Sequence, residues 1–171
     1  VRRNDQLITP AKTIKTKMID FGKGPVTSTR ITWGDVFTAW YSTGIPNIEN
    51  YLVIPQHLHS KMKMLDFVRP IFRLSLVRDY LKGKIKPGSE PKLLAKTHTL
   101  VWGEVMDYQG NRKSARLRGP EAGVIWTGIS SLCVVKKVLG GHWAAGYQTP
   151  GKVYGPDLVL ESEEVTREDL S

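Results

Sequence analysis

Two strand-like runs joined by a short turn constrain the fold of this chain more than any other feature. Residues 95 to 107 (AKTHTLVWGEVMD) and 111 to 119 (NRKSARLRG) are separated by the tripeptide YQG. Two such runs with a short glycine-containing connection favour an antiparallel β-hairpin. The sequence therefore predicts at least one antiparallel sheet.

Further strands are expected near both ends of the chain. Residues 12 to 21 alternate in polarity, GKGP follows as a turn, and residues 26 to 33 are rich in β-branched side chains. The segment 48 to 55 reads as the next strand. The last third, residues 144 to 162, contains many glycines and prolines and is predicted to end in a short apolar strand.

A short helix is predicted over residues 36 to 43. Asp35 precedes it as a candidate N-cap, and Gly44 follows as the left-handed residue that ends it. Pro46 prevents the helix from continuing. The stretch YSTGIPNIENY is thus a helix end followed by a strand.

Two longer helical regions are expected later. Residues 58 to 82 combine apolar and basic positions, and Pro70 should split them into two helices near residue 69; residues 83 to 92 form a linker. A helix from residue 121 to 139 has an uncharged centre and ends at two glycines. We expect it to be the most buried helix. This order of elements favours an α+β fold over a doubly wound α/β fold.

Composition limits the class of protein. A chain of 171 residues with 40% hydrophobic content fits one domain, residues 1–171. The net charge of +9 is concentrated in residues 61 to 86. We interpret this region as a solvated helix face rather than a nucleic-acid surface, because no nucleic-acid-reading motif accompanies it, although an anionic small molecule would also use such charge.

The sequence also suggests where the protein resides. A single cysteine excludes an internal disulfide framework, and no apolar run reaches the roughly 18 residues of a membrane helix. A soluble, cytoplasmic protein is therefore expected. Cys133 itself lies among apolar neighbours and is predicted to be a buried, inert thiol.

Several common chemistries are not predicted. The sequence GKGPVT lacks the third glycine of a dinucleotide-binding turn and continues as a strand, so we reject it as a cofactor loop. His57 and His59 could share one side of an extended segment and bind a metal. Surface or capping roles are preferred for them, because a metal site needs three or four convergent ligands and His98 and His142 are distant in sequence.

Two loop segments have the composition of a binding site. Residues 33 to 47 and 146 to 157 present uncharged hydrogen-bonding side chains and aromatic rings on backbones stiffened by glycine and proline. Each segment alone could be only a set of caps and turns, but together they predict a shared cleft. The expected cleft residues are Tyr41, Thr43, Gly44, Asn47, Gln148, Thr149, Tyr154 and Asp157, with Thr43, Asn47, Gln148 and Tyr154 on one concave face.

Residues 21 to 55, 101 to 121 and 146 to 161 together resemble the C-terminal half of saccharopine dehydrogenase-like proteins, chiefly their bacterial branch. The resemblance implies an α+β domain with a mixed, largely antiparallel sheet that binds substrate and contributes to a homodimer. It also implies that NAD or NADP is bound by an N-terminal Rossmann domain, which we expect to be missing from this chain. No catalytic residue can be carried over.

The function that this resemblance implies is a substrate-binding and oligomerisation domain of an NAD(P)-dependent oxidoreductase. Such a domain would bind no cofactor and would not be active alone. The alternative is a noncatalytic interaction or scaffold domain whose basic region engages an acidic partner or a membrane surface.

Overall fold

The computed structural model describes residues 1–9, 15–55, 77, 80 and 96–170. Apart from residues 77 and 80, the helices predicted within residues 58 to 82 lie outside this part of the chain. The linker 83 to 92 and both His57 and His59 lie outside it too. In chain order the named elements are β1 (Arg2–Arg3), β2 (Gln6–Leu7), β3 (Thr16–Asp20), β4 (Pro25–Ile31), α1 (Asp35–Thr43), β5 (Asn50–Val53), β6 (His98–Met106), β7 (Arg112–Pro120), α5 (Ile125–Leu139), α6 (Pro150–Tyr154), η2 (Pro156–Glu161) and β8 (Thr166–Leu170).

The predicted hairpin is confirmed as β6 and β7. The two strands pair antiparallel over nine positions, from His98 opposite Pro120 to Met106 opposite Arg112. Gly110 in the connecting turn has a φ of 89°, a left-handed conformation that glycine adopts without a steric penalty. β8 extends this sheet by pairing antiparallel with β7, which gives the order β6-β7-β8.

The second three-stranded sheet has the order β3-β4-β5 and is also antiparallel. It contains the strands predicted within residues 12 to 21, 26 to 33 and 48 to 55. Its central strand carries Ser28 and Thr29, which are fully or almost fully buried, and Ile19 on β3 is buried too. The centre of this sheet is therefore one of the most enclosed places in the described residues.

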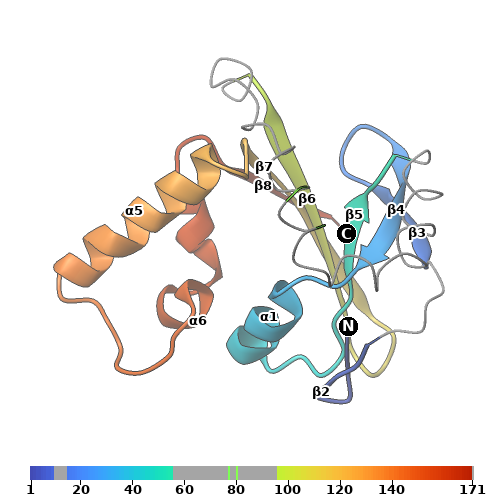
Figure 1. The fold of residues 1–171 in the computed structure, drawn as a ribbon, viewed down its shortest axis with the longest axis horizontal. Helices are drawn as coiled ribbons and strands as arrows, with labels where there is room; N and C mark the ends of the chain where they lie inside the picture. Colours follow the sequence, from blue (N-terminus) through green and yellow to red (C-terminus); the bar gives the residue numbers. More distant parts are fainter. Residues whose placement is uncertain (10–14, 56–76, 78–79, 81–95, 171) are drawn as a thin grey trace.

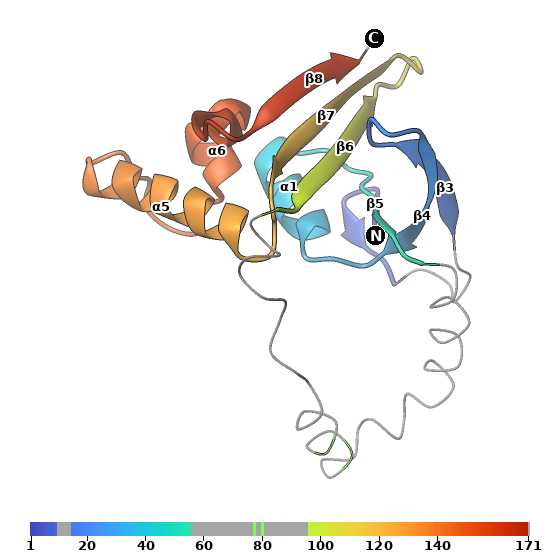
Figure 2. The same ribbon diagram turned by 90° about the horizontal axis from the view of Figure 1, so that it is seen from above.

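The two sheets lie beside each other, as Figures 1 and 2 show, and charged side chains connect them. Lys17 on β3 pairs with Glu104 on β6 at 3.0 Å, and Arg116 on β7 pairs with Asp20 at 3.0 Å. Lys17 also lies over the ring of Trp102, 4.5 Å from its centroid. The contact between the sheets is thus substantially polar.

The architecture is α+β with antiparallel sheets and a few helices. The expected mixed character of the sheet is not observed, since every strand pairing among the described residues is antiparallel. Among the described helices, none has both the length and the apolar character needed to cross a bilayer.

Helix α1 ends as predicted but begins differently. Gly44 has a φ of 70°, and its amide donates to the carbonyl of Trp40 at 2.7 Å, so it is the left-handed C-terminal cap. The N-cap is Gly34, and Asp35 is the first helical residue, so the prediction of Asp35 as N-cap was wrong. In that place its carboxylate faces the positive end of the helix dipole instead of accepting a capping hydrogen bond.

Helix α5 is not the most buried helix, in contrast to our prediction. It has no buried residue, and Leu132 and Leu139 remain 62% and 82% exposed. The helix contacts β7 through Trp126, whose ring fits against Gly119. An uncharged sequence permits burial, but burial also needs a covering surface, and much of α5 has none among the described residues.

The end of the chain also differs from expectation. The residues predicted as a short apolar strand form the 3-10 helix η2, and the strand that follows, β8, is largely exposed and polar. Gly155 and Pro156 account for the difference. Gly155 has a φ of 85°, which breaks α6, and Pro156 begins the next helical turn.

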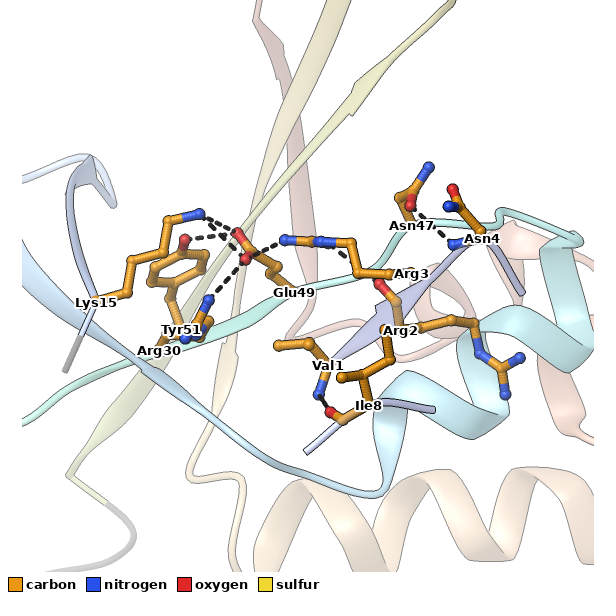
Figure 3. A network of polar contacts seen from close by, with 10 residues as sticks. All are labelled: Val1, Arg2, Arg3, Asn4, Ile8, Lys15, Arg30, Asn47, Glu49 and Tyr51. Atoms are coloured by element: carbon orange, nitrogen blue, oxygen red, sulfur yellow. Dashed lines mark hydrogen bonds and ion pairs between the residues drawn. The ribbon is translucent and has the colours of Figure 1, made fainter. Parts of the chain in front are cut away.

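Glu49 links the N-terminal hairpin, in which β1 and β2 pair antiparallel, to the β3-β4-β5 sheet (Figure 3). Its carboxylate accepts hydrogen bonds from Tyr51 at 2.7 Å, Lys15 at 3.0 Å and Arg30 at 3.2 Å, and it also pairs with Arg3. Only 16% of the Glu49 side chain is exposed. Three cations and a phenol therefore converge on one carboxylate at the junction of four separate segments.

Candidate functional site

The C-terminal half of α1 lies against the segment 146 to 157, the two stretches that the sequence singled out. The hydroxyl of Tyr41 donates to the backbone carbonyl of Tyr147 at 2.6 Å, and their rings meet edge to face with centroids 5.1 Å apart. Phe37 packs on Tyr147 from the preceding turn of α1. We call this contact the α1–α6 junction, comprising Phe37, Tyr41, Ser42, Tyr147, Thr149 and Lys152.

A chain of hydroxyl groups forms the buried part of the junction. The oxygens of Ser42 and Thr149 are 2.7 Å apart, and Ser42 also contacts the carbonyl of Thr38 at 2.8 Å. Each hydroxyl has one proton to donate. Because the Ser42 hydroxyl donates its proton to the carbonyl of Thr38, the Thr149 hydroxyl must be the donor in its hydrogen bond with Ser42. Thr149, only 7% exposed, then keeps a hydroxyl oxygen with acceptor capacity.

Lys152 gives the junction a positive charge. Its ammonium group lies 4.0 Å from the centroid of the Tyr41 ring, a cation–π contact. Within the part of the chain that the structure describes, Lys152 has no carboxylate partner. Its charge is therefore stabilised by an aromatic face and solvent, and it is available to an anion.

A pocket of about 600 Å³ adjoins the junction on the other side of α6. Helix α5 forms one wall, and α6, Gly155 and η2 form the other. The lining residues are uncharged and mostly aliphatic or small: Ser130, Ser131, Cys133, Val134, Val135, Pro150, Gly151, Gly155, Pro156, Leu158 and Val159. Its size lies within the range of small-molecule binding sites, roughly 300 to 1,000 Å³.

Gly151 separates the pocket from the junction. It lines the pocket, and a Cβ atom built on it would contact only the Ser42 hydroxyl, at 4.0 Å. The backbone of Gly151 therefore borders the pocket, and the position that a side chain would take is directed toward Ser42 in the junction.

The polar groups beside the pocket are paired with one another. Cys133 donates to Glu161 at 3.3 Å, and Lys137 pairs with the other oxygen of Glu161 at 2.7 Å. Partial burial, followed by the hydrogen bond and charge of Glu161, raises the pKa of the Cys133 thiol. The thiol is half-buried rather than buried, which corrects the sequence prediction. It stays protonated, so the pocket is suited to binding rather than to thiolate chemistry.

Of the predicted cleft residues, Tyr41 and Thr149 both belong to the junction. The polar groups of the others form hydrogen bonds or ion pairs outside it. Thr43 donates to Ala39 within α1, while Gly44 is the cap of that helix. The remaining contacts are Asn47 with the amide of Asn4, Gln148 with the carbonyl of Ala145, Tyr154 with the carbonyl of His142, and Asp157 with Arg167.

Sequence reasoning missed two parts of the site. Lys152 was not selected, although it follows Thr149 by three residues and therefore lies about one helical turn after it in α6. The α5 wall was not selected either, because the helix was expected to be buried. The small polar residues Ser130 and Ser131 on this helix were the only indication in the sequence that one of its faces lines a pocket.

The described residues include no candidate metal centre, and the glycine turn after β3 does not have the form of a dinucleotide-binding turn. No group of three potential metal ligands occurs among them. The glycine turn after β3 leads into β4 rather than into a helix. Asp20 accepts the amides of Gly22 and Gly24 at 2.7 and 3.0 Å, so a carboxylate already occupies the place that a phosphate would need.

Comparison of the chain with protein-family models, with curated proteins and with solved structures found no match.

Proposed function

We propose that this chain is the substrate-binding domain of an NAD(P)-dependent oxidoreductase of the saccharopine dehydrogenase-like type. The observation that carries the proposal is the α1–α6 junction. Two segments more than 100 residues apart in sequence, both selected for their binding-site composition, meet through the Tyr41–Tyr147 and Ser42–Thr149 contacts.

The junction has the properties that a substrate site needs. Thr149 supplies a buried acceptor, Lys152 supplies a cation without a carboxylate partner among the described residues, and Tyr41 and Tyr147 supply flat apolar surfaces. Polar groups held by hydrogen bonds to a rigid backbone orient a ligand at little entropic cost. The site is therefore suited to a small organic molecule that has both polar and apolar parts.

The chemistry implied by the resemblance is hydride exchange at a carbon–nitrogen bond or a related carbonyl or alkene group. A nicotinamide cofactor would supply the hydride. The glycine turn after β3 does not fit that cofactor, and the resemblance implies that a separate Rossmann domain would bind it. The residues of this chain would bind the substrate, orient it and hold water away from it; oligomerisation belongs to the same proposal.

Ligand titration tests this function. We would measure calorimetric binding of secondary amines that join two amino-acid skeletons, saccharopine among them, with the parent amino acids as comparison ligands. At least one secondary amine should bind with a Kd below about 1 mM. Thr149→Val should weaken that binding by about tenfold, because it removes one buried hydroxyl while keeping the shape of the side chain.

The matched control is Thr127→Val on α5, since the Thr127 hydroxyl donates to the carbonyl of Ala122, away from the junction. This variant should bind like the unmodified chain. The proposal is wrong if no secondary amine binds, or if both variants weaken binding equally. The alternative, an interaction or scaffold domain, would then be tested through the basic region, most of which lies outside the described residues.

A further inference from the structure

We infer that the pocket between α5 and η2 binds an uncharged, largely apolar small molecule. This site is distinct from the α1–α6 junction, and the inference does not depend on the proposed function. The class of ligand follows from the walls of the pocket, from the polar contacts that join those walls, and from the volume between them.

The walls of the pocket are apolar and uncharged. Val134 and Val135 of α5 lie on one side, and Leu158 and Val159 of η2 lie on the other. Within the described part of the chain, no charged side chain lines the space. Water there has few hydrogen-bonding partners, so its replacement by an apolar ligand is favourable. A charged ligand would lose hydration and meet no opposite charge on the walls.

Polar contacts join the two walls beside the pocket. Glu161 at the end of η2 accepts a hydrogen bond from the Cys133 thiol at 3.3 Å and pairs with Lys137 at 2.7 Å. The hydroxyl of Tyr154 on α6 donates to the carbonyl of His142, just after α5, at 2.7 Å. These contacts hold α6 and η2 beside α5 (Figures 1 and 2), while the aliphatic walls stay separated by the pocket. A ligand between them therefore supplies the apolar burial that the walls do not give each other.

Few hydrogen-bonding groups of the lining are left for a ligand. The Ser131 hydroxyl donates to the carbonyl of Thr127 at 2.7 Å, and the Cys133 thiol donates to Glu161. Ser130 has no such contact with another residue that the structure describes. It can bind one uncharged polar group, such as an alcohol.

The volume limits the size of the ligand. An enclosed apolar cavity of about 150 Å³ accommodates benzene, so a pocket of about 600 Å³ admits a molecule of roughly 10 to 20 non-hydrogen atoms. Lys136 and Lys152 carry charges without a carboxylate partner among the described residues, but neither lines the pocket. Comparison of neutral and charged ligands of equal length therefore tests the assigned class.

The experiment uses N-phenyl-1-naphthylamine, an uncharged fluorescent probe of apolar sites, with the full chain at neutral pH. Decanol, decanoate and decylammonium would be compared as competitors that share one hydrocarbon chain and differ in charge. Decanol should displace the probe at about fivefold lower concentration than either ion, because only the ions must give up the hydration of a charge.

Cys133 reports where the ligand binds. It is the only cysteine of the chain, it lines the pocket, and it is partly exposed. Saturating decanol should slow its alkylation by N-ethylmaleimide about threefold or more, because the bound ligand covers the thiol. An unchanged rate would place the ligand elsewhere and overturn the inference.

A matched pair of variants separates the pocket from general apolar surface. Val135 and Val138 both lie on α5 and are 49% and 44% exposed, but only Val135 lines the pocket. Val135→Asp should weaken decanol binding by about tenfold and remove the protection of Cys133. Val138→Asp should bind like the unmodified chain, and circular dichroism should show that both variants fold.

The inference is also overturned if the probe does not bind, or if either ion competes as well as decanol. Equal losses in Val135→Asp and Val138→Asp would overturn it too, and would indicate that the outer face of α5 is a general apolar surface that fits a partner protein. Failure of the proposed function gives a different result, because Thr149→Val should leave decanol binding unchanged.

Discussion

Replacement of Glu49 by glutamine should destabilise the protein in a pH-dependent way. Burial alone would raise the pKa of this carboxyl group, but hydrogen bonds from Tyr51, Lys15 and Arg30 and the charge of Arg3 outweigh burial. The pKa falls from 4.5 to about 2. The carboxylate is therefore stabilised by the folded structure, and its loss should be measurable.

The pKa shift sets the size of the effect. A fall from 4.5 to about 2 corresponds to about 3 kcal/mol at neutral pH, at about 1.4 kcal/mol per pKa unit. The side chains of Arg3 and Lys15 are 37% and 49% exposed, so solvent screens part of this energy. We expect Glu49→Gln to lower the free energy of unfolding by about 2 kcal/mol at neutral pH.

The sign of the pH dependence follows from the lowered pKa. The stabilisation is present above the unfolded-state pKa of about 4.5 and is lost as the pH falls toward the folded-state value of about 2. Urea unfolding should therefore show that the difference between the unmodified chain and Glu49→Gln shrinks below pH 4.5. At about pH 3 more than half of it should be gone.

The matched control is Glu163→Gln, because Glu163 is exposed and has no ion pair among the described residues. Its unfolding free energy should stay within about 0.5 kcal/mol of the unmodified chain. The reasoning is refuted if Glu49→Gln changes stability as little as the control, or if its effect is the same at neutral pH and near pH 3.

Four further outcomes are expected. Gly44→Ala should lower the free energy of unfolding by about 1 kcal/mol, because a Cβ there meets no atom within 4 Å and only the left-handed backbone is penalised; urea unfolding measures this, and an unchanged stability would contradict it. Gly119→Ala should cost about 1 to 3 kcal/mol, because its Cβ would approach the Trp126 ring to 2.8 Å, and a neutral effect in the same assay would disprove that fit. Titration calorimetry with NADH and NADPH should detect no binding to this chain, whereas micromolar binding of either would exclude the assignment of the cofactor to another domain. Sedimentation at tens of micromolar should show a homodimer, as the resemblance implies, and a strict monomer would argue against it.

The parts of the fold that depend on local chemistry were predictable from sequence. The β6-β7 hairpin, the strand pair on either side of the GKGP turn and the end of α1 at Gly44 all follow from residues close together in the chain. In each case the turn or cap residue itself has the required backbone conformation. Such features need no knowledge of the distant chain.

The features that failed depend on distant partners. The uncharged sequence of α5 predicts a buried helix, but α5 has no buried residue, because burial depends on which distant segments pack on the helix. The Glu49 cluster joins four segments whose proximity no local pattern indicates. The start of α1 is different, because it is a local error: Gly34 rather than its neighbour Asp35 occupies the N-cap position.

The candidate site was predictable in outline only. Loop composition selected the two segments, and the structure has them in contact, but Asn47 points its amide oxygen at the N-terminal hairpin rather than at Tyr147. Side-chain direction depends on the exit angle of each loop. Composition does not reveal the exit angle. The sequence therefore could not show that Thr149 and Tyr41 point into the contact between the two segments while Asn47 points away from it.

The most direct test of the proposed substrate site is to locate a bound ligand by amide chemical shifts. The tightest-binding secondary amine would be titrated into the isotopically labelled chain. The proposed substrate site predicts that the largest shifts fall on residues 41 to 43 and 147 to 155, which contain every residue of the junction except Phe37 and all of α6. Shifts confined to the β6-β7-β8 sheet or to the Glu49 cluster, or no shifts at saturating ligand, would contradict it.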